Sequence, residues 1–269
     1  MTRTPDFLKR IIEQKRVRLA RSMARGTLEE LKAEAARVRS EAQPHAFRGA
    51  LERRESLNII AEIKRASPSL GDIRRDLSPA GLAREYERGG AAAISVLTEE
   101  DHFKGALEDL REARAVTPLP LLRKDFIIDE WQLYEAAAAG ADALLLIVAA
   151  LDDATLARLR SLTEDDLGLD ALVEVHTAEE MRRAASCGAK IIGVNNRNLH
   201  NFEVTLETSV ELFKRSPPGT LLVSESGLRS REDLRRLKAL GYQGFLIGEN
   251  LMRAENPAQA LRALLTEQG

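Results

Sequence analysis

Glu62 and Lys64 are the first residues in this sequence whose types and spacing suit chemistry. They end a short apolar run within residues 58–71, which read NIIAEIKRASPSLG and close on a turn cluster of Ser, Pro and Gly. Side chains of a strand alternate between its two faces, so Ile60, Glu62 and Lys64 share one face. Two opposite charges on an apolar strand are costly unless they are paired or solvated. This run therefore ends either at a ligand or at an exposed edge where water surrounds an ion pair.

Similar polar endings recur after other apolar runs. The third run ends in LLRKDF, which puts Lys124 and Phe126 on one face, and the fifth run ends at Glu174. The sixth run ends in GVNNR, which puts Asn195 and Arg197 on one face. The other endings offer small or acidic residues: Ser67-Pro68 after the first run, Glu225-Ser226-Gly227 after the seventh, and Ile247-Gly248 in the eighth.

Lysines and carboxylates at such endings suit proton transfer or covalent catalysis. In a low-dielectric site Lys64 or Lys124 can act as a general acid or form a Schiff base, and Glu174 can take up protons. Ser226-Gly227 and Gly248 expose backbone N–H groups, which suits a phosphate; ordinary turn glycines are the alternative. The four histidines are dispersed and lack ligand spacing, so we expect no metal.

Elements that could bring these endings together follow from the hydrophobic pattern. Eight nearly all-apolar runs, typical of buried parallel strands, alternate with helical patterns. This count favours a closed (β/α)8 TIM barrel; a doubly wound open sheet is the alternative. The expected strands are 58–63, 92–97, 119–124, 143–148, 171–175, 190–194, 221–224 and 244–247. The expected helices are 79–88, 106–115, 130–139, 153–162, 178–186, 208–214, 231–240 and 256–265.

The residues before the first strand predict an N-terminal helical extension over 1–55, so that 1–269 form a single barrel domain. One helix, capped by Thr4 or Asp6, is expected to run to Ser22 with one apolar and one basic face. A second is expected over 27–39, where Thr27 and Glu30 form a capping box. Residues 43–53 are expected to be a looser connection.

Composition describes an ordinary globular protein. Hydrophobic residues make up 44% of the 269 residues and charged residues 30%, and the net charge is −2. This balance favours neither nucleic acid nor an anionic membrane as a partner. The single cysteine and the lack of a signal peptide or membrane span favour the cytoplasm.

Seven stretches resemble those of one enzyme family, indole-3-glycerol phosphate synthase, and they occur in the expected order over essentially the whole chain. They are IIAEIKRASPS, SVLTEEDHFKG, LPLLRKDFIID, LVEVH, GVNNRNLHNFEV, VSESGL and FLIGENLM. The resemblance implies a monomeric barrel enzyme without a cofactor. Its phosphorylated substrate is 1-(2-carboxyphenylamino)-1-deoxyribulose 5-phosphate, which loses CO2 and water as the indole ring closes in tryptophan biosynthesis.

The resemblance also implies roles for the charged residues. Lys124 is similar to the family's general acid at the substrate carbonyl. Glu174 is similar to the carboxylate that orients this lysine or moves protons. Lys64 and Glu62 resemble the pair that assists the later dehydration, and Lys64 also lies near the substrate carboxylate. How the steps divide between Lys64 and Lys124 stays open.

Further positions resemble the family's substrate contacts. Asn195, which we count with the catalytic residues, and Arg197 resemble the groups that grip the reacting end. Phe103, Phe126 and Leu199 resemble the apolar wall around the anthranilate ring. The carboxylate- and phosphate-side contacts are Ser67, Ser226, Gly227 and Gly248, and Pro68, Glu225, Ile247 and Glu249 complete the expected set.

Two positions depart from the family pattern. Leu70 stands where many members have lysine, which leaves the first loop less positive. Glu249 follows Gly248 where some members have serine. Because a carboxylate repels a phosphate, we expect the Glu249 side chain to point away and only its backbone to assist.

Two other functions remain as alternatives. A Schiff-base aldolase on a phosphate-binding barrel would also use Lys124 beside Glu174, and trapping with borohydride would reveal it. A non-catalytic barrel that binds a phosphosugar would tolerate the loss of the acid–base residues, yet this sequence has them all.

Overall fold

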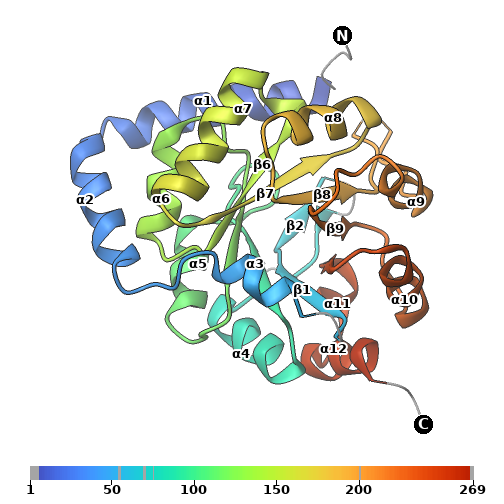
Figure 1. Ribbon diagram of the computed structural model, residues 1–269. Coiled ribbons are helices and arrows are strands. Elements are labelled where there is room, and N and C mark those ends of the chain that lie inside the picture. The colour runs from blue at the N-terminus through green and yellow to red at the C-terminus, as the bar shows by residue number, and fades with distance from the viewer. Residues whose placement is uncertain (1–5, 54–55, 69–70, 75, 200, 267–269) are drawn as a thin grey trace.

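The computed structural model describes residues 6–53, 56–68, 71–74, 76–199 and 201–266. Eight parallel strands of this part of the chain close into a barrel, and helices surround it (Figure 1). Closure comes from the first and last strands, because Ile60 pairs with Leu246 on one side and with Ala93 on the other. The predicted TIM barrel is confirmed, and the doubly wound open sheet is wrong.

The barrel strands agree closely with the expected runs. The third begins at Leu121, two residues later than expected, because Pro120 has no N–H to donate to a neighbouring strand. The sixth and seventh each include one more polar residue, Asn195 and Glu225, which the sheet holds in register with each other. The strands are β1 (Asn58–Ile63), β4 (Ala93–Leu97), β5 (Leu121–Lys124), β6 (Ala143–Ile147), β7 (Asp170–Val175), β8 (Ile191–Asn195), β9 (Leu221–Glu225) and β10 (Gly244–Ile247).

Outer helices follow each strand, and most of them begin at a side-chain cap. Asp129, Asp152 and Thr177, for example, accept hydrogen bonds from backbone N–H groups of the first turn. These helices are α4 (Pro79–Gly89), α5 (Leu107–Arg114), α6 (Glu130–Ala138), α7 (Asp153–Ser161), α8 (Ala178–Ser186), α9 (Glu207–Phe213), α10 (Arg231–Leu240) and α12 (Pro257–Leu265).

Strand side chains divide into two apolar layers. Ile59, Ala61 and Ile63 of β1 pack outward against helices such as α4, while Ile60 packs inside the barrel with Leu122 of β5. Glu62 lies two residues beyond Ile60 and therefore points inward as well. The alternation predicted for this strand thus places its charges inside the barrel mouth and not on a solvated edge.

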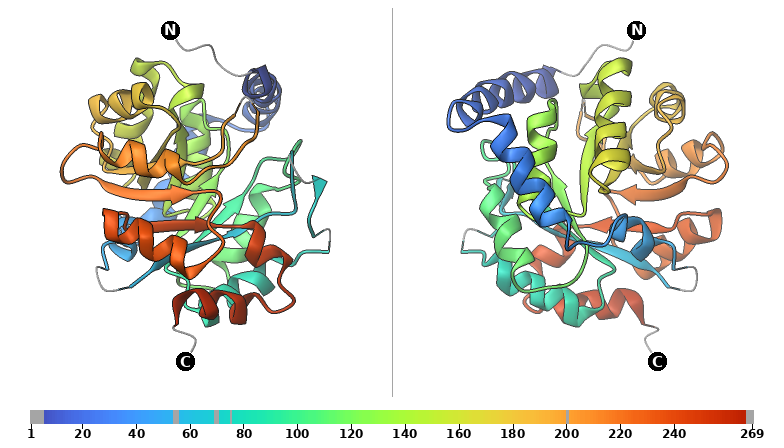
Figure 2. Two further views of the ribbon diagram at one scale, coloured as in Figure 1. Left: turned by 90° about the vertical axis from the view of Figure 1, so that its right-hand side faces the viewer. Right: turned by 60° about the vertical axis from the view of Figure 1, so that its left-hand side comes forward.

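Three helices precede β1: α1 (Asp6–Met23), α2 (Leu28–Arg39) and α3 (Ala46–Leu51). The capping box predicted for Thr27 and Glu30 is present at the start of α2. Residues 46–51 are helical and not the looser connection expected, because Phe47 and Leu51 are fully buried among the inner side chains of the strands. In the two views of Figure 2, α1 lies at the top of the molecule and α12 at the bottom.

Five short elements were not predicted. After β1, β2 (Ala66–Ser67) and β3 (Gly71–Asp72) form an antiparallel pair. A 3-10 turn, η1 (Val148–Ala150), follows β6, a π turn, η2 (Leu162–Asp166), follows α7, and α11 (Glu249–Arg253) follows β10. They are too short to produce a periodic hydrophobic pattern, so the sequence carries little signal for them.

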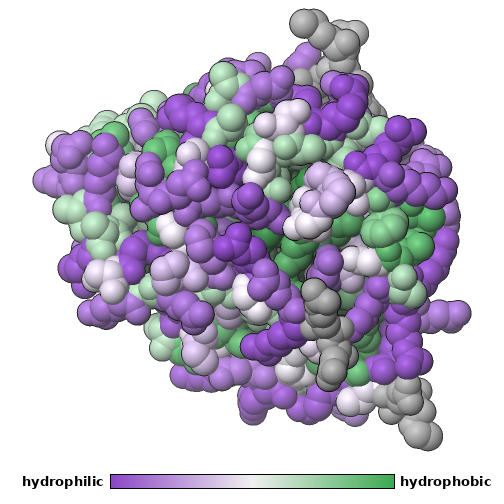
Figure 3. Space-filling view, in the orientation of Figure 1, coloured by the Kyte–Doolittle hydropathy of each residue, from purple (hydrophilic) through white to green (hydrophobic). Residues whose placement is uncertain are grey.

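Hydrophilic residues cover most of the face seen in Figure 3. The strands lie beneath them and are almost wholly buried. None of the helices in the described ranges is long and apolar enough to cross a membrane.

Candidate active site

Lys124 lies at the centre of the candidate site, where the C-terminal ends of three strands meet. Its Nζ is 3.1 Å from Oε2 of Glu174 on β7 and 3.0 Å from Oε2 of Glu225 on β9. The side chains of Lys124, Glu174 and Glu225 are 14%, 4% and 1% exposed. The structure therefore joins Lys124 to Glu174, which the sequence placed in one mouth, and adds Glu225 as a second partner.

The charges of Lys124, Glu174 and Glu225 shift one another's pKa values. Burial opposes the charge on Lys124, but Glu225, Glu174 and Glu62 outweigh it and raise the pKa of the lysine above its ordinary value. Burial also opposes charge on Glu174, yet Lys124 and His176 lower the pKa of this carboxyl. Burial and the neighbouring carboxylates raise the pKa of Glu225 to about 7, against the attraction of Lys124. Near neutral pH Lys124 is therefore an ammonium, Glu174 is a carboxylate, and Glu225 is only partly ionised.

The Glu62 and Lys64 side chains form an ion pair in the same mouth, with Nζ 2.5 Å from Oε1. Their side chains are 4% and 15% exposed. Their spacing in the sequence left open whether the two charges are paired or solvated, and the structure shows that they are paired.

Two glycines make room for the buried carboxylates. A Cβ on Gly193 of β8 would lie 2.1 Å from Oε1 of Glu225. A Cβ on Gly248 would lie 2.4 Å from Oε1 of Glu62. The sequence suggested that Gly248 serves a phosphate; the structure gives it a second role, which is to leave space for an acidic side chain.

Replacing Gly248 with alanine is expected to lower kcat/KM by about 10–100-fold, since small displacements of reacting groups have effects of this size. The new methyl group would displace Glu62 and disturb its pair with Lys64. Steady-state ring-closure assays, with inorganic phosphate as a competing ligand, measure both functions of the glycine. Weaker phosphate inhibition with an unchanged kcat would show that the glycine serves only the phosphate.

Gly49→Ala is the matched control for this variant. Gly49 lies inside α3, and a Cβ there would have no atom within 4 Å. It should leave activity unchanged and stabilise the protein by about 0.5–1 kcal/mol, the usual helix preference of alanine over glycine.

The end of β8 supplies amide and guanidinium groups. Asn195 hydrogen-bonds the side chain of Glu174 and so helps to lower the pKa of that carboxyl. Its Oδ1 also accepts a hydrogen bond of 3.0 Å from the backbone N–H of Arg197. The Arg197 guanidinium donates to the carbonyl of Phe202 at 3.3 Å, which holds this loop beside the mouth.

The turn after β9 has the backbone that a phosphate site requires. Ser226 and Gly227 both have positive φ angles, 67° and 82°. The side chain of Asn250 in α11 donates to the carbonyl of Leu228 at 3.3 Å, which joins this turn to the segment after β10. Glu249 pairs with Arg253 at 3.3 Å, so a cation partly neutralises the carboxylate that departs from the family pattern. The other departure, Leu70, lies outside the described residues.

An apolar wall borders the charged groups. The rings of Phe103 and Phe126 lie 6.4 Å apart, as neighbours in the same cavity lining as Leu199. The first turn of α1 adds Phe7 and Leu8, which the sequence analysis did not place in the site. Only their apolar helical spacing was visible in the sequence, and it does not reveal what a helix covers.

All of the residues predicted for the site line one cavity. The structure therefore brings together the following: Glu62, Lys64, Ser67, Pro68, Phe103, Lys124, Phe126, Glu174, Asn195, Arg197, Leu199, Glu225, Ser226, Gly227, Ile247, Gly248 and Glu249.

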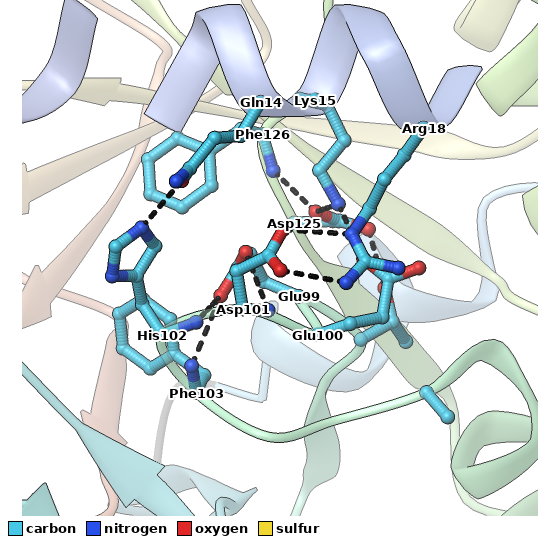
Figure 4. Close-up of polar contacts among 12 residues, drawn as sticks. Gln14, Lys15, Arg18, Glu99, Glu100, Asp101, His102, Phe103, Asp125 and Phe126 are labelled. Carbon is cyan, nitrogen blue, oxygen red and sulfur yellow. Dashed lines mark hydrogen bonds and ion pairs between the residues drawn. The ribbon is translucent and has the colours of Figure 1, made fainter. Parts of the chain in front are cut away.

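Helix α1 is fixed over the mouth by charged residues of its predicted basic face (Figure 4). Lys15 is only 5% exposed, and its Nζ is 2.7 Å from Oδ1 of Asp125 and 3.1 Å from Oε2 of Glu100. The Arg18 guanidinium donates two hydrogen bonds, of 2.7 and 2.6 Å, to Asp101. These two residues of the basic face therefore form ion pairs, which tie the helix to the loop after β4 and to the end of β5.

The acidic loop after β4 is occupied by protein donors. Glu99, Glu100 and Asp101 are close enough together to hold a metal ion. However, Glu99 accepts backbone N–H groups from three residues, and the other two carboxylates pair with Lys15 and Arg18. Hydrogen bonds and ion pairs account for this cluster.

Comparisons with known proteins identify a family. The model of the indole-3-glycerol phosphate synthase family matches residues 8–264. The chain is 44% identical to the synthase of that name from Variovorax paradoxus, over 97% of this chain and 99% of the relative. It is 50% identical to the one from Koribacter versatilis, over 84% and 87%.

Solved structures share the fold at low identity. KGPDC from Streptococcus mutans superposes with a TM-score of 0.61 and 17% identity, over 78% of this chain and 96% of the other. Thiamine phosphate pyrophosphorylase from Pyrococcus furiosus gives a TM-score of 0.58 and 19% identity, over 78% and 95%. These two likenesses support the barrel alone.

Proposed function

The chain belongs to the indole-3-glycerol phosphate synthase family, and from this premise we infer that its cavity closes the indole ring. The substrate is 1-(2-carboxyphenylamino)-1-deoxy-D-ribulose 5-phosphate, and the products are indole-3-glycerol phosphate, CO2 and water. The observation that best supports this function is the ammonium of Lys124 between two buried carboxylates, in a cavity that also has an aromatic wall.

The first step needs an acid at a ketone oxygen. The ring carbon that bears the carboxylate forms a bond to the ketone carbon, and the carbonyl oxygen takes a proton from the acid. We assign this proton to Lys124, which its three acidic neighbours keep in the ammonium form. Loss of CO2 then returns its bonding electron pair to the ring and restores aromaticity.

The second step removes water. The hydroxyl group left by the ketone departs as water after it takes a proton, and a proton leaves the neighbouring carbon to complete the indole. We assign assistance at the departing hydroxyl to the Glu62–Lys64 pair and proton uptake to Glu174. We divide these transfers between the two lysines by their partners, because Lys124 lies between Glu174 and Glu225 whereas Lys64 pairs with Glu62.

Two parts of the cavity lining suit the two ends of the substrate. We assign the anthranilate ring to the wall of Phe103, Phe126 and Leu199, and the phosphate to the turn at Ser226 and Gly227. The left-handed backbone of that turn and the small side chains suit an anion held by N–H groups.

The direct test is incubation of the purified protein with this substrate while indole fluorescence is recorded. We expect a fluorescent product together with one equivalent of CO2. Borohydride added during turnover tests the aldolase alternative. Lys124 is held as an ammonium, whereas a Schiff base requires a neutral amine, so we expect no covalent adduct. A trapped adduct without indole formation would replace the proposed function.

Exhaustive chelation is expected to leave turnover unchanged. The proposed chemistry needs only proton transfers, and the cavity offers lysines for that purpose. The measurement is ring closure before and after treatment with a chelator, with each divalent ion then added back. A loss of activity that one ion restores would contradict this expectation.

A further inference from the structure

His176 lies beside Glu174, the carboxylate that pairs with Lys124. It is the first residue after β7, and its Nε2 is 3.4 Å from Oε1 of Glu174, whose other oxygen meets Lys124. Its Nδ1 is 3.2 Å from Oε2 of Glu180. The Glu174 carboxylate therefore lies between an ammonium and an imidazole, and the imidazole lies between two carboxylates.

The turn after β7 holds this imidazole in place. Thr177 caps α8, and Glu180 in the first turn accepts a 2.7 Å hydrogen bond from the backbone N–H of His176. Glu180 thereby binds both the backbone and the ring of the same residue. The His176 side chain is 10% exposed, and its Nε2 completes no hydrogen bond to any described residue. A buried ring nitrogen without a hydrogen bond thus faces the carboxylate of the site at ion-pair distance.

We propose that His176 is a positioning residue for ring closure, which keeps Glu174 ionised and oriented toward Lys124. The imidazole achieves this from outside the cavity lining, which includes Glu174 but not His176. This proposal rests on the proposed function, because Glu174 is the group assigned to take up the proton.

The charges around His176 favour this role. Burial opposes a charged imidazole, but Glu180 and Glu174, with Glu225 further away, raise the pKa of His176 above its usual value. Lys124 is the cation beyond Glu174. Without the imidazolium, Glu174 would keep Lys124 as its one close cation and would still be buried. Its pKa would then rise, and it would be protonated over part of the working pH range.

The test is the pH dependence of kcat in His176→Phe and His176→Gln. A neighbouring charge shifts the pKa of a carboxyl by about 1–3 units, so the acidic limb of His176→Phe should move upward by at least about one unit. On the acid side of neutrality kcat should therefore fall, with a smaller change in KM, and the deficit should disappear at alkaline pH. In His176→Gln the amide can still donate a hydrogen bond but carries no charge. Glu174 should therefore stay oriented, while the acidic limb of the kcat profile stays shifted upward.

His45→Phe is the matched control. His45 pairs at 3.1 Å with buried Asp170, the first residue of β7, so it lies at the N-terminal end of that strand and is not part of the site. This variant should lose stability while the acidic limb stays in place. A uniform loss of kcat at every pH in His176→Phe, as a structural role would give, would overturn the proposal.

A second readout does not depend on turnover. Titration of the imidazole by NMR in the free protein should give His176 a pKa above the ordinary 6.5, and Glu174→Gln should lower it. An unchanged titration in Glu174→Gln would also overturn the proposal. If the wild-type protein forms no indole, the proposed function fails instead, and the titration still decides whether the two side chains are coupled.

Discussion

Replacing Lys124 with arginine or methionine should lower turnover by at least about 100-fold, which is the lower range for loss of a general acid. Arginine keeps the positive charge beside Glu174 and Glu225, but guanidinium does not give up a proton and has a different shape. Methionine keeps much of the length and removes both charge and proton. Similar losses in the two variants would therefore identify the proton, and not the charge, as the contribution of Lys124.

The measurement is single-turnover ring closure together with equilibrium binding of a non-reactive substrate analogue. Binding should weaken less than turnover, because the phosphate and ring contacts remain. A structure of Lys124→Arg with the analogue bound would expose any misfit of the larger side chain. Lys190→Arg, which makes the same change at an exposed position just before β8, should behave like the wild type. Near-normal turnover in Lys124→Arg would transfer the acid role to Lys64.

Removing Lys15, the buried cation of α1, should destabilise the protein more than any other substitution proposed for it. In Lys15→Met, Asp125 keeps its hydrogen bond from Thr98 and its ion pair with Arg123 at 3.2 Å, yet loses its closest cation. Breaking a buried ion pair by removing one partner typically costs 3–5 kcal/mol, and the remaining contacts favour about 3 kcal/mol here. KM should also rise, because Phe7 and Leu8 at the start of the same helix line the cavity.

The pH dependence of this loss has a definite sign. Burial opposes charge on Asp125, but Lys15 and then Arg123 lower its pKa below the ordinary value. A carboxyl whose pKa is lowered by folding stabilises the protein at any pH above its pKa in the unfolded state, which is about 4 for Asp. This stability is lost as the pH falls through the pKa of the carboxyl in the folded state. The difference between Lys15→Met and the wild type should therefore be full at pH 7 and shrink in acid.

Denaturant unfolding of the two proteins at several pH values measures the effect. Lys9→Met makes the same substitution on an exposed face of the same helix and should change stability by less than about 1 kcal/mol. Adding Asp125→Asn to Lys15→Met should recover part of the loss, since the buried carboxylate that lost its closest cation is then replaced by a neutral amide. If Lys15→Met is as stable as Lys9→Met, the contact is not stabilising.

The fold was predictable because its signals are local. Each strand of the barrel is an apolar run, and each outer helix has a periodic pattern, so their order and count were visible along the chain. The positions of Glu62, Lys124 and Glu174 near strand ends also predicted that they would lie in one site, because the C-terminal ends of all strands of such a barrel surround one mouth.

Features that depend on contacts between distant segments were not predictable in this way. Lys15 looked like one basic residue among several, and only the folded structure places it against Asp125. The same is true of Gly248, whose packing against Glu62 joins the last strand of the barrel to the first. The helical pattern of residues 46–51 was too short to recognise, although Phe47 fills one end of the interior.

The order of synthesis adds a consequence to the placement of α1 and α3. Lys15 pairs with residues 85 and 110 positions later, and His45 with a residue 125 positions later. At a translation rate of about 5–20 residues per second, α1 waits roughly 5–20 s before its partners leave the ribosome. During that interval Leu8, Ile11 and Ile12, which are buried in the finished protein, have no surface to cover. The first helix made thus waits for partners that are made 85 and 110 residues later, and meanwhile the nascent chain carries an exposed apolar stripe that chaperones can bind.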